Sequence, residues 1–250
     1  MSRHDVLLTT AQKASLFEDG YVRVPGVVPA AGVEAALRAI NHSIGQGLPP
    51  SELAIYRSRS FCPELQRTRV ILDLFHETAA AGLAESLLGP IEAVRTGQIA
   101  LAFPQTGTPE PPYPHLDGLH TPTNGVPAGE VRSFTLLVGV ILSDVTTAGA
   151  GNLTVWPGSH RLYEAYFRER GPKSLLEGMP RVELPEPVEL TGGTGDVVLC
   201  HYQLAHAVGA NTSPHVRYAV YFRLKSRGHD SRRWDCLTDI WKEWRGLRER

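Results

Sequence analysis

The chain has 250 residues, of which 42% are hydrophobic and 20% are charged, and this composition is typical of a globular protein rather than a disordered one. Lys and Arg total 25 against 26 Asp and Glu, so the surplus of positive charge that favours nucleic-acid binding is absent. The longest apolar run, Phe134–Leu142, is far shorter than the roughly 20 residues of a membrane-spanning helix. We therefore expect neither a nucleic-acid partner nor a membrane partner.

The cysteines argue against a disulfide framework. There are three of them, Cys62, Cys200 and Cys236, and none forms a C-x-x-C pair of the kind that holds zinc. In the N-terminal segment 1–14 the apolar patch Val6–Leu8 is too short for a signal-peptide core. These features favour a reducing, cytoplasmic environment.

The first third of the sequence has mainly helical patterns, with capping residues and apolar residues at helical spacing. The expected elements are a helix that begins at Thr9–Thr10 and ends near Gly20, a strand at Tyr21–Val24, a helix over Pro29–Ile44, and two helices, or one broken near Gly82, over Thr68–Leu88.

From about residue 91 the pattern changes to short strands separated by Gly and Pro turns, which is typical of a sandwich or barrel and not of a parallel sheet with alternating helices. The expected strands lie within Ile91–Phe103, Val131–Leu142, Asn152–Trp156, Val188–Leu190, Asp196–Cys200 and Val216–Leu224. We expect a polar, partly helical insertion at Arg161–Met179 and a short helix within Trp234–Arg250. The whole chain is interpreted as one domain, with a helical layer over about 1–90, a β core over about 91–225 and a tail over about 230–250.

The sequence His115-Leu116-Asp117 is the first candidate for chemistry. Residues i and i+2 of a strand point to the same side, so one imidazole and one carboxylate would converge there. A His-x-Asp pair is common by chance, and the alternative is a turn whose side chains bond nearby backbone. A metal site therefore requires a third ligand from another part of the chain.

His206, which follows the apolar segment Val197–Cys200, is the candidate for that third ligand, and His201 is the alternative. Two histidines and one carboxylate leave three coordination positions open, an arrangement that suits Fe(II) chemistry with oxygen. Arg217 lies eleven residues after His206 on a predicted strand. Its guanidinium could hold a dicarboxylate through paired hydrogen bonds, with Arg223 as the alternative.

In this order and spacing, His115-x-Asp117, His206 and Arg217 resemble the phytanoyl-CoA dioxygenase family. Three other segments add to the resemblance, which covers roughly residues 10–225. They are the opening Phe17–Gly26, the segment Gly149–Arg161 with its Pro-Gly-Ser-His sequence, and Gly195-Asp196-Val-Val-Leu followed by His206 and Asn211.

The resemblance implies a double-stranded β-helix (a cupin-like jelly roll) and an Fe(II)- and 2-oxoglutarate-dependent dioxygenase. It further implies that His115, Asp117 and His206 are the catalytic iron ligands, that 2-oxoglutarate chelates the iron, and that Arg217 pairs with its C5 carboxylate. Oxygen, iron and 2-oxoglutarate would then hydroxylate a C–H bond of a small molecule, with release of succinate and CO2. Because related halogenases replace the carboxylate ligand with a small residue, Asp117 disfavours halogenation.

Further contacts are expected around this set. The family often has Gln at the position of Gln98, and Thr135 could hydrogen-bond a carboxylate of 2-oxoglutarate, so both are candidate cosubstrate-binding residues. Gln98 shares a strand face with Ala100 and Ala102, whereas Ile99, Leu101 and Phe103 should face the core. His120 is a candidate for the substrate-pocket wall. Trp156 is a second such candidate, although the sheet core is the commoner place for a residue of this kind.

Two other classes of function stay open from the sequence. One is a non-oxidative cupin-type enzyme that holds zinc or nickel in the same ligands, and the other is a catalytically silent jelly-roll binding module. Within the oxygenases, desaturation, epimerisation and ring formation use the same iron site. We expect the loop Gly118–Glu130 and the insertion Arg161–Pro180 to set the substrate, because loops usually carry selectivity.

Overall fold

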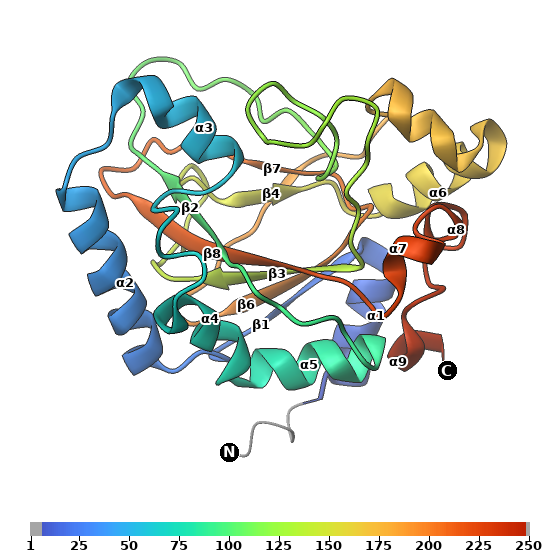
Figure 1. Cartoon of the computed structure of the whole chain (residues 1–250), viewed down its shortest axis with the longest axis horizontal. Helices are drawn as coiled ribbons and strands as arrows, with labels where there is room; N and C mark the ends of the chain where they lie inside the picture. The colour runs from blue at the N-terminus through green and yellow to red at the C-terminus, as the bar shows by residue number, and fades with distance from the viewer. Residues whose placement is uncertain (1–6, 249–250) are drawn as a thin grey trace.

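The computed structural model describes residues 7–248, so the first half of the segment considered for a signal peptide and the last two residues of the tail lie outside it. Two antiparallel sheets form the centre of the molecule (Figure 1). The larger sheet has the order β1 (Tyr21–Val24), β6 (Val197–His201), β3 (Leu136–Ile141), β8 (Arg217–Leu224) and β2 (Gln98–Ala102). The smaller has the order β5 (Val188–Glu189), β4 (Leu153–Val155) and β7 (His206–Val208). Inward residues of both sheets share one apolar cluster, and this two-layer arrangement confirms the jelly roll.

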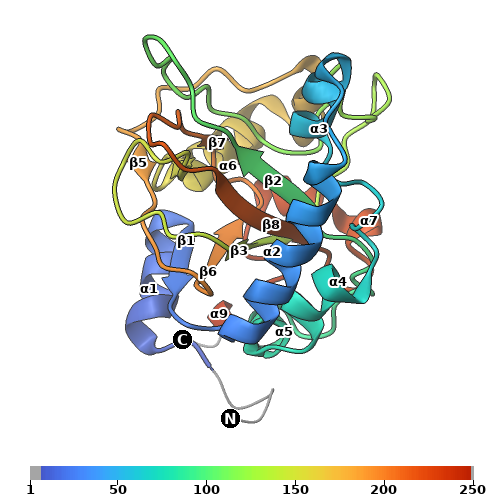
Figure 2. The same cartoon turned by 90° about the vertical axis from the view of Figure 1, so that its left-hand side faces the viewer.

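Helices cover the other face of the larger sheet, as Figures 1 and 2 show. The N-terminal helices are α1 (Thr10–Asp19), α2 (Ala30–Gly45), α3 (Leu53–Ser58) after the short 3-10 helix η1 (Pro50–Glu52), α4 (Arg69–His76) and α5 (Ala79–Leu88). Side chains of β8 and α4 meet in this layer, where the ring centroids of Phe75 and Phe222 are 5.5 Å apart. Each such buried Phe stabilises the fold by roughly 1.5–3 kcal/mol. The helical layer is thus packed directly on the sheet that carries the candidate site.

The expected N-terminal elements are confirmed with one correction. Thr9 caps α1 through a capping box with Gln12, and α1 ends at Gly20 as expected. The helical region after residue 68 does break into two helices, but the break lies at Thr78 and not near Gly82. The Thr78 hydroxyl accepts a hydrogen bond from the amide of Ala80 and so starts a new helix, of which Gly82 is an interior residue.

Several strands are shorter than expected, because pairing partners limit them. Residues 91–97 are not part of β2, since the amide of Gly97 donates to the carbonyl of Gln66 instead of to β8, and farther back Ile91 forms an isolated bridge with Ser226. The insertion contains α6 (Ser159–Arg170) and the 3-10 helix η2 (Pro172–Glu177). The short helix expected within Trp234–Arg250 is instead two, α8 (Asp235–Thr238) and α9 (Arg245–Arg248), and a further short helix, α7 (His229–Arg232), precedes them. In the described part of the chain, none of the helices is long and apolar enough to span a bilayer.

Two buried histidines lie where the C-terminal segment packs against the end of the larger sheet. His201 donates from Nε2 to the carbonyl of Ile240 at 2.9 Å and accepts the amide of Gln203 at Nδ1, also at 2.9 Å. Its ring stacks on Trp244 with centroids 5.2 Å apart. Burial lowers the pKa of His201 to about 3 and that of His160 to about 4. Both side chains are therefore neutral parts of the packed structure.

Acid should destabilise the fold because His160 and His201 are buried in their neutral form. The unfolded chain binds a proton on His201 near the ordinary pKa of 6.5, whereas the folded protein resists protonation down to about 3. Because the unfolded state binds more protons in this window, the free energy of unfolding should fall by about 1.4 kcal/mol per pH unit for this group as the pH drops. His201→Gln, which keeps a donor for Ile240, should flatten the slope measured by urea unfolding between about pH 4.5 and 7. An unchanged slope would mean that other groups control acid stability.

Candidate metal centre and cosubstrate site

The two candidate histidine ligands are brought together by their own backbones. His115 and His206 form an isolated antiparallel bridge, with each amide donating to the other's carbonyl at 3.1 and 3.2 Å. The two imidazole rings consequently lie side by side, with centroids 4.6 Å apart. His206 is the first residue of β7, a strand that the sequence patterns do not predict. The smaller sheet thus fixes one ligand and positions the other through it.

The carboxylate of Asp117 lies between the two rings. Its Oδ1 is 3.6 Å from His115 Nε2, and its Oδ2 is 3.6 Å from His206 Nε2. Asp117 is in a turn and not on a strand, and the next residue, Gly118, adopts a φ of +82°. A Cβ atom at Gly118 would lie 2.2 Å from the carbonyl oxygen of Arg132, so only glycine fits this turn. One ligand atom from each residue lies within 4.8 Å of the others, as a shared metal ion requires.

The protonation of His206 suits metal binding. Its Nδ1 is 3.0 Å from the carbonyl oxygen of Leu204, which can only accept, so Nδ1 carries the proton and Nε2 presents its lone pair toward Asp117. Burial alone would raise the pKa of Asp117, but Arg223 and the two histidines hold it well below its usual range. The carboxylate is therefore ionised at neutral pH. Burial lowers the pKa of His206, yet the same carboxylate outweighs it and leaves that pKa raised.

These three residues open onto a cavity of about 750 Å³. Gln98 and Ala100 from β2 line it, in agreement with the predicted pocket face, while Ile99 and Leu101 face the helical core. His120 also lines it, and its Nδ1 lies 2.6 Å from the carbonyl oxygen of Val126. The contact ties the ring to the loop that covers the cavity. Gln98 and His120 are thus beside the candidate metal centre.

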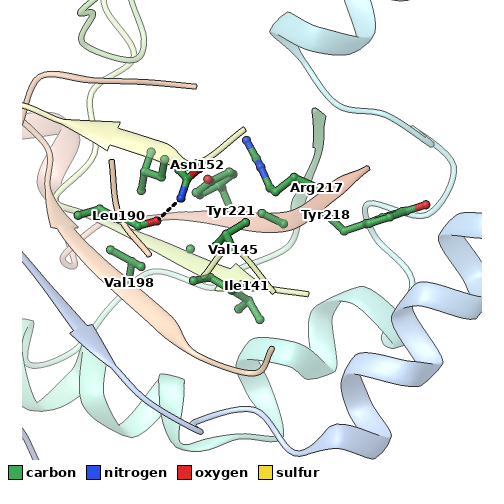
Figure 3. Close-up of a pocket in the computed structure, with 12 residues that line it drawn as sticks. Ile141, Val145, Asn152, Leu190, Val198, Arg217, Tyr218 and Tyr221 are labelled. Carbon is green, nitrogen blue, oxygen red and sulfur yellow. Dashed lines mark hydrogen bonds between the residues drawn. The ribbon is translucent and has the colours of Figure 1, made fainter. Parts of the chain in front are cut away.

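Arg217 is buried at the start of β8, where its side chain reaches toward Asn152 and Tyr221 (Figure 3). Its Nε donates to the carbonyl of Gly151 at 2.6 Å, and Nη1 lies 3.4 Å from the carbonyl oxygen of Ala100. The remaining nitrogen, Nη2, is buried and has no hydrogen-bond partner in the described chain. A buried guanidinium with an unpaired N–H fits a bound carboxylate, because leaving such a group unpaired is costly.

Arg217 lines a small cavity of about 20 Å³ that adjoins the larger one. Leu153 and Tyr221 line both, so they separate Arg217 from the space beside the candidate metal ligands. The chemistry of the two places nevertheless fits 2-oxoglutarate, since the ligand set of His115, Asp117 and His206 leaves positions for a chelating group and the unpaired Nη2 of Arg217 suits a carboxylate.

The sequence patterns do not predict two residues of the site, Tyr221 and Arg223, as contacts beside the metal ligands. Arg223 is considered from the sequence only as the alternative to Arg217. Tyr221 and Arg223 lie on the same face of β8 as Arg217, and both line the larger cavity. Arg223 contacts Oδ2 of Asp117 through Nη2 at 2.8 Å and Nε at 3.0 Å. Extending the two-residue alternation from Arg217 along the strand would have identified both.

Two predicted contacts and the alternative ligand lie elsewhere. Thr135 shares the strand face of Leu137 but precedes β3, and its hydroxyl donates to the carboxylate of Glu243 at 2.7 Å, outside the cavity. Trp156 is only 5% exposed and belongs to the apolar cluster between the sheets. It therefore occupies the sheet core, which is the alternative to the pocket wall in the sequence analysis. His201, the alternative to His206, faces the C-terminal segment.

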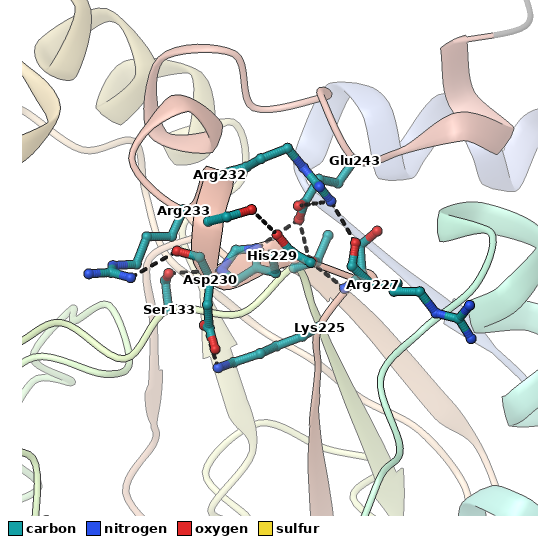
Figure 4. Close-up of polar contacts among 12 residues, drawn as sticks. Ser133, Lys225, Arg227, His229, Asp230, Arg232, Arg233 and Glu243 are labelled. Atoms are coloured by element: carbon teal, nitrogen blue, oxygen red, sulfur yellow. Dashed lines mark hydrogen bonds and ion pairs between the residues drawn. The ribbon is translucent and has the colours of Figure 1, made fainter.

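A second group of potential ligands consists of His229, Cys236 and Glu243. Figure 4 shows the polar contacts around His229 and Glu243. Here His229 Nδ1 and Glu243 Oε2 are 2.7 Å apart, which is a direct hydrogen bond and leaves no room for an ion between them. Arg232 adds a second contact to Glu243 at 3.0 Å, and Ser133 lies 2.9 Å from His229 Nε2. The 3.6 Å separations around Asp117 contrast with this geometry. The second group is a buried polar network that holds the C-terminal segment.

Comparison with known proteins agrees with the fold. A family model described as Phytanoyl-CoA dioxygenase (PhyH) matches residues 16–219. Among solved structures, the carbocyclase SnoK from nogalamycin biosynthesis is 22% identical, with a TM-score of 0.57 over 93% of this chain and 92% of that one. EctD from S. alaskensis with 2-oxoglutarate and 5-hydroxyectoine is 20% identical, with a TM-score of 0.58 over 88% of this chain and 76% of that one.

HygX from Streptomyces hygroscopicus, with nickel and 2-oxoglutarate bound, is 17% identical, with a TM-score of 0.58 over 89% of each chain. No curated protein sequence matches this one. At these identities the solved structures support the fold, whereas the family match covers most of the chain. The fold and the family match define an Fe(II)- and 2-oxoglutarate-dependent oxygenase. The chain belongs to the phytanoyl-CoA dioxygenase family.

Paired substitutions should separate the two clusters. Asp117→Ala should abolish Mn(II) binding, measured by calorimetry, and should also lower the free energy of unfolding, because it removes the partner of Arg223. Glu243→Ala should retain one equivalent of bound Mn(II) but lower the free energy of unfolding by about 3 kcal/mol, because it breaks a buried ion pair.

Asp230→Ala is the matched control for stability. It removes the exposed ion pair with Lys225 and should cost less than about 1 kcal/mol. Two equivalents of metal in the unmodified protein, with one lost in Glu243→Ala, would show instead that His229, Cys236 and Glu243 bind metal.

Proposed function

We propose that this enzyme hydroxylates a C–H bond of a small molecule, with His115, Asp117 and His206 as the iron ligands and Arg217 as the anchor for 2-oxoglutarate. The observation that carries the proposal is the convergence of two imidazoles on one carboxylate, each at 3.6 Å. This ligand set leaves open positions for the two chelating atoms of 2-oxoglutarate and for oxygen. Iron supplies oxygen activation there, coupled to conversion of 2-oxoglutarate to succinate and CO2.

The protein side chains contribute orientation and charge. The hydrogen bond from His206 Nδ1 to the carbonyl of Leu204 keeps Nε2 deprotonated and directed at the ion. Arg223 engages Oδ2 of Asp117, so Oδ1 is the carboxylate oxygen that would hold the ion. Arg217 offers its unpaired Nη2 to a carboxylate, and its other contacts to backbone carbonyls prevent it from moving away.

Gln98 and Tyr221 are our remaining candidates for polar contacts to the cosubstrate or substrate, because both line the cavity beside the ligands. His120 would form part of its wall. We do not extend the proposal to Thr135 or Trp156, whose side chains are engaged outside this cavity. The substrate-facing segments would be the loop after Asp117 and the residues around Met179, which also line it.

The alternative functions account less well for the same features. A silent binding module has no chemical need for a buried, unpaired guanidinium next to an intact ligand set. A non-oxidative cupin-type enzyme has no role for a dicarboxylate anchor. Because one apolar cluster contains residues of both the helices and the larger sheet, we propose that the chain works as a single domain. Its three free thiols favour a reducing cytoplasm.

The test is 2-oxoglutarate binding to protein loaded with Mn(II), followed by succinate release with Fe(II) and oxygen. Arg217→Met should weaken 2-oxoglutarate binding by about 50-fold, the loss of a charge-assisted hydrogen bond, while leaving Mn(II) affinity unchanged. Arg217→Lys should recover part of the loss. Arg161→Met, which alters a surface arginine that contacts the carbonyl of Phe17, is the control. Absence of 2-oxoglutarate binding by the unmodified, metal-loaded protein would refute the proposal.

A further inference from the structure

The large cavity has an unbalanced charge. Among the described residues that line it, Asp117 is the single carboxylate, whereas two guanidinium groups, Arg57 and Arg223, belong to the same wall. Arg57 lies on α3 and Arg223 on β8, segments far apart in the sequence. Two cations around one carboxylate that is itself a metal ligand point to a bound anion.

Arg223 has capacity left for such an anion. Its Nη2 and Nε both contact the same oxygen of Asp117, at 2.8 and 3.0 Å, while its Nη1 makes no hydrogen bond within residues 7–248. The guanidinium carbon is 5.8 Å from the ring centroid of Phe134, and the side chain is 36% exposed. A guanidinium has five N–H donors arranged for oxyanions, so the free edge can bind a second carboxylate or a phosphate.

Arg57 has no ion pair or hydrogen bond to any other described residue. The nearby acidic residue on its own helical segment, Glu52, is engaged by the hydroxyl of Tyr56. The helix that carries Arg57 is tied to the loop after Asp117, because Nε of Arg59 donates to the carbonyl of Thr123 at 2.8 Å. The second cation is thus an exposed side chain that lines the cavity and has no protein partner among the described residues.

Binding of the proposed cofactors does not remove the excess. A divalent metal and Arg217 together balance the carboxylate of Asp117 and the two carboxylates of 2-oxoglutarate. Arg57 and Arg223 then add two positive charges to the cavity wall that no further carboxylate among the described lining residues balances, and such a surplus attracts anions.

The remainder of the wall is largely apolar. Leu119, Met179 and Val208 line the cavity together with Tyr113, and Tyr113 and Val208 are 77% and 49% exposed. Exposed large apolar side chains gathered around a cavity commonly mark a binding surface. The wall suits a ligand whose body is apolar and whose charge is confined to one end.

We infer that Arg57 and Arg223 form an anion subsite, and that the primary substrate is an apolar small molecule with a free carboxylate or other oxyanion close to the C–H bond that reacts. The inference rests on the proposed function. The oxyanion of the substrate would lie close to the reacting C–H bond because Arg223 contacts the proposed metal ligand Asp117 directly. A thioester whose only charges lie on a distant carrier would leave the free edge of Arg223 and the side chain of Arg57 without an anion, so the inference specifies the free acid.

Matched probes test this inference. Octanoate and 3-phenylpropanoate, with the corresponding neutral amides and coenzyme A thioesters, would be titrated into protein loaded with Mn(II) and 2-oxoglutarate. Mn(II) does not support turnover, and it broadens the NMR lines of nearby probe protons. At least one acid should bind about tenfold more tightly than its amide and its thioester, with the strongest broadening at the carbons next to the carboxylate.

Arg57→Met should reduce that preference for the acid at least about threefold without changing Mn(II) or 2-oxoglutarate affinity, since Arg57 contacts none of the proposed ligands. Arg223→Lys should keep more of the preference than Arg223→Met. Arg67→Met, an exposed arginine away from the cavity, is the control and should bind the probes as the unmodified protein does.

The inference is overturned if the amide or the thioester binds as tightly as the acid, if none of the probes binds, or if the preference survives in the Arg57→Met and Arg223→Met double variant. The same titrations with Mn(II) alone keep the two proposals apart. Failure to bind 2-oxoglutarate contradicts the proposed function, whereas loss of the acid preference in protein that does bind 2-oxoglutarate contradicts the anion subsite alone.

Discussion

The site depends on one constraint, which is that β8 must pack one face into the helical layer while its other face carries two arginines. Its outward residues, Val220 and Phe222, pack into the helical layer, and its inward residues, Arg217 and Arg223, project between the sheets. The strict alternation of a strand makes the two roles compatible, because neighbouring residues point in opposite directions. A shift of one residue in the pairing of β8 with β3 would exchange the faces and bury both guanidinium groups among helices. The helical layer therefore stabilises the register on which the site depends.

The same logic explains how much could be predicted from the sequence. Alternation in Gln98–Phe103 was sufficient to assign faces, and the spacing of His115, Asp117, His206 and Arg217 was sufficient to suggest a family. The alternation is a local pattern, and the spacing of the four site residues depends only on their order in the sequence, so both can be seen without the structure. The assignment of Gln98 to the cavity side is confirmed for this reason, and the role of each ligand stays a prediction until metal binding is measured.

Other features depend on partners that no local pattern shows. The strand β7 is three residues long and exists because His206 and Val208 pair with β4, so its sequence has no alternation long enough to detect. Thr135 has the expected strand face but lies beyond the end of β3, where a C-terminal glutamate more than a hundred residues away takes its hydroxyl. In α5 the cap at Thr78 determines the helix start, whereas Gly82, the stronger apparent break, is tolerated inside the helix.

Some polar side chains of the molecule have all their hydrogen-bond and ion-pair partners within the protein, and others do not. The first kind stabilises the fold, and the second kind lies at the candidate site. Around Glu243, the carboxylate accepts from Thr135, His229 and Arg232, so each charge is matched within the protein and the network is complete. Around Asp117 the matching is incomplete, since Arg217 retains a buried unpaired N–H and Arg57 has no partner in the described chain. Folding alone does not account for the buried, unpaired N–H of Arg217, because such a group lowers stability relative to a paired one, whereas the exposed Arg57 is solvated by water. Dicarboxylates are the molecules to test as partners of Arg217, and apolar acids are the molecules to test as partners of Arg57 and Arg223. Because Arg217 and Arg223 both lie on β8, this one strand would bind the cosubstrate near its start and the substrate near its end.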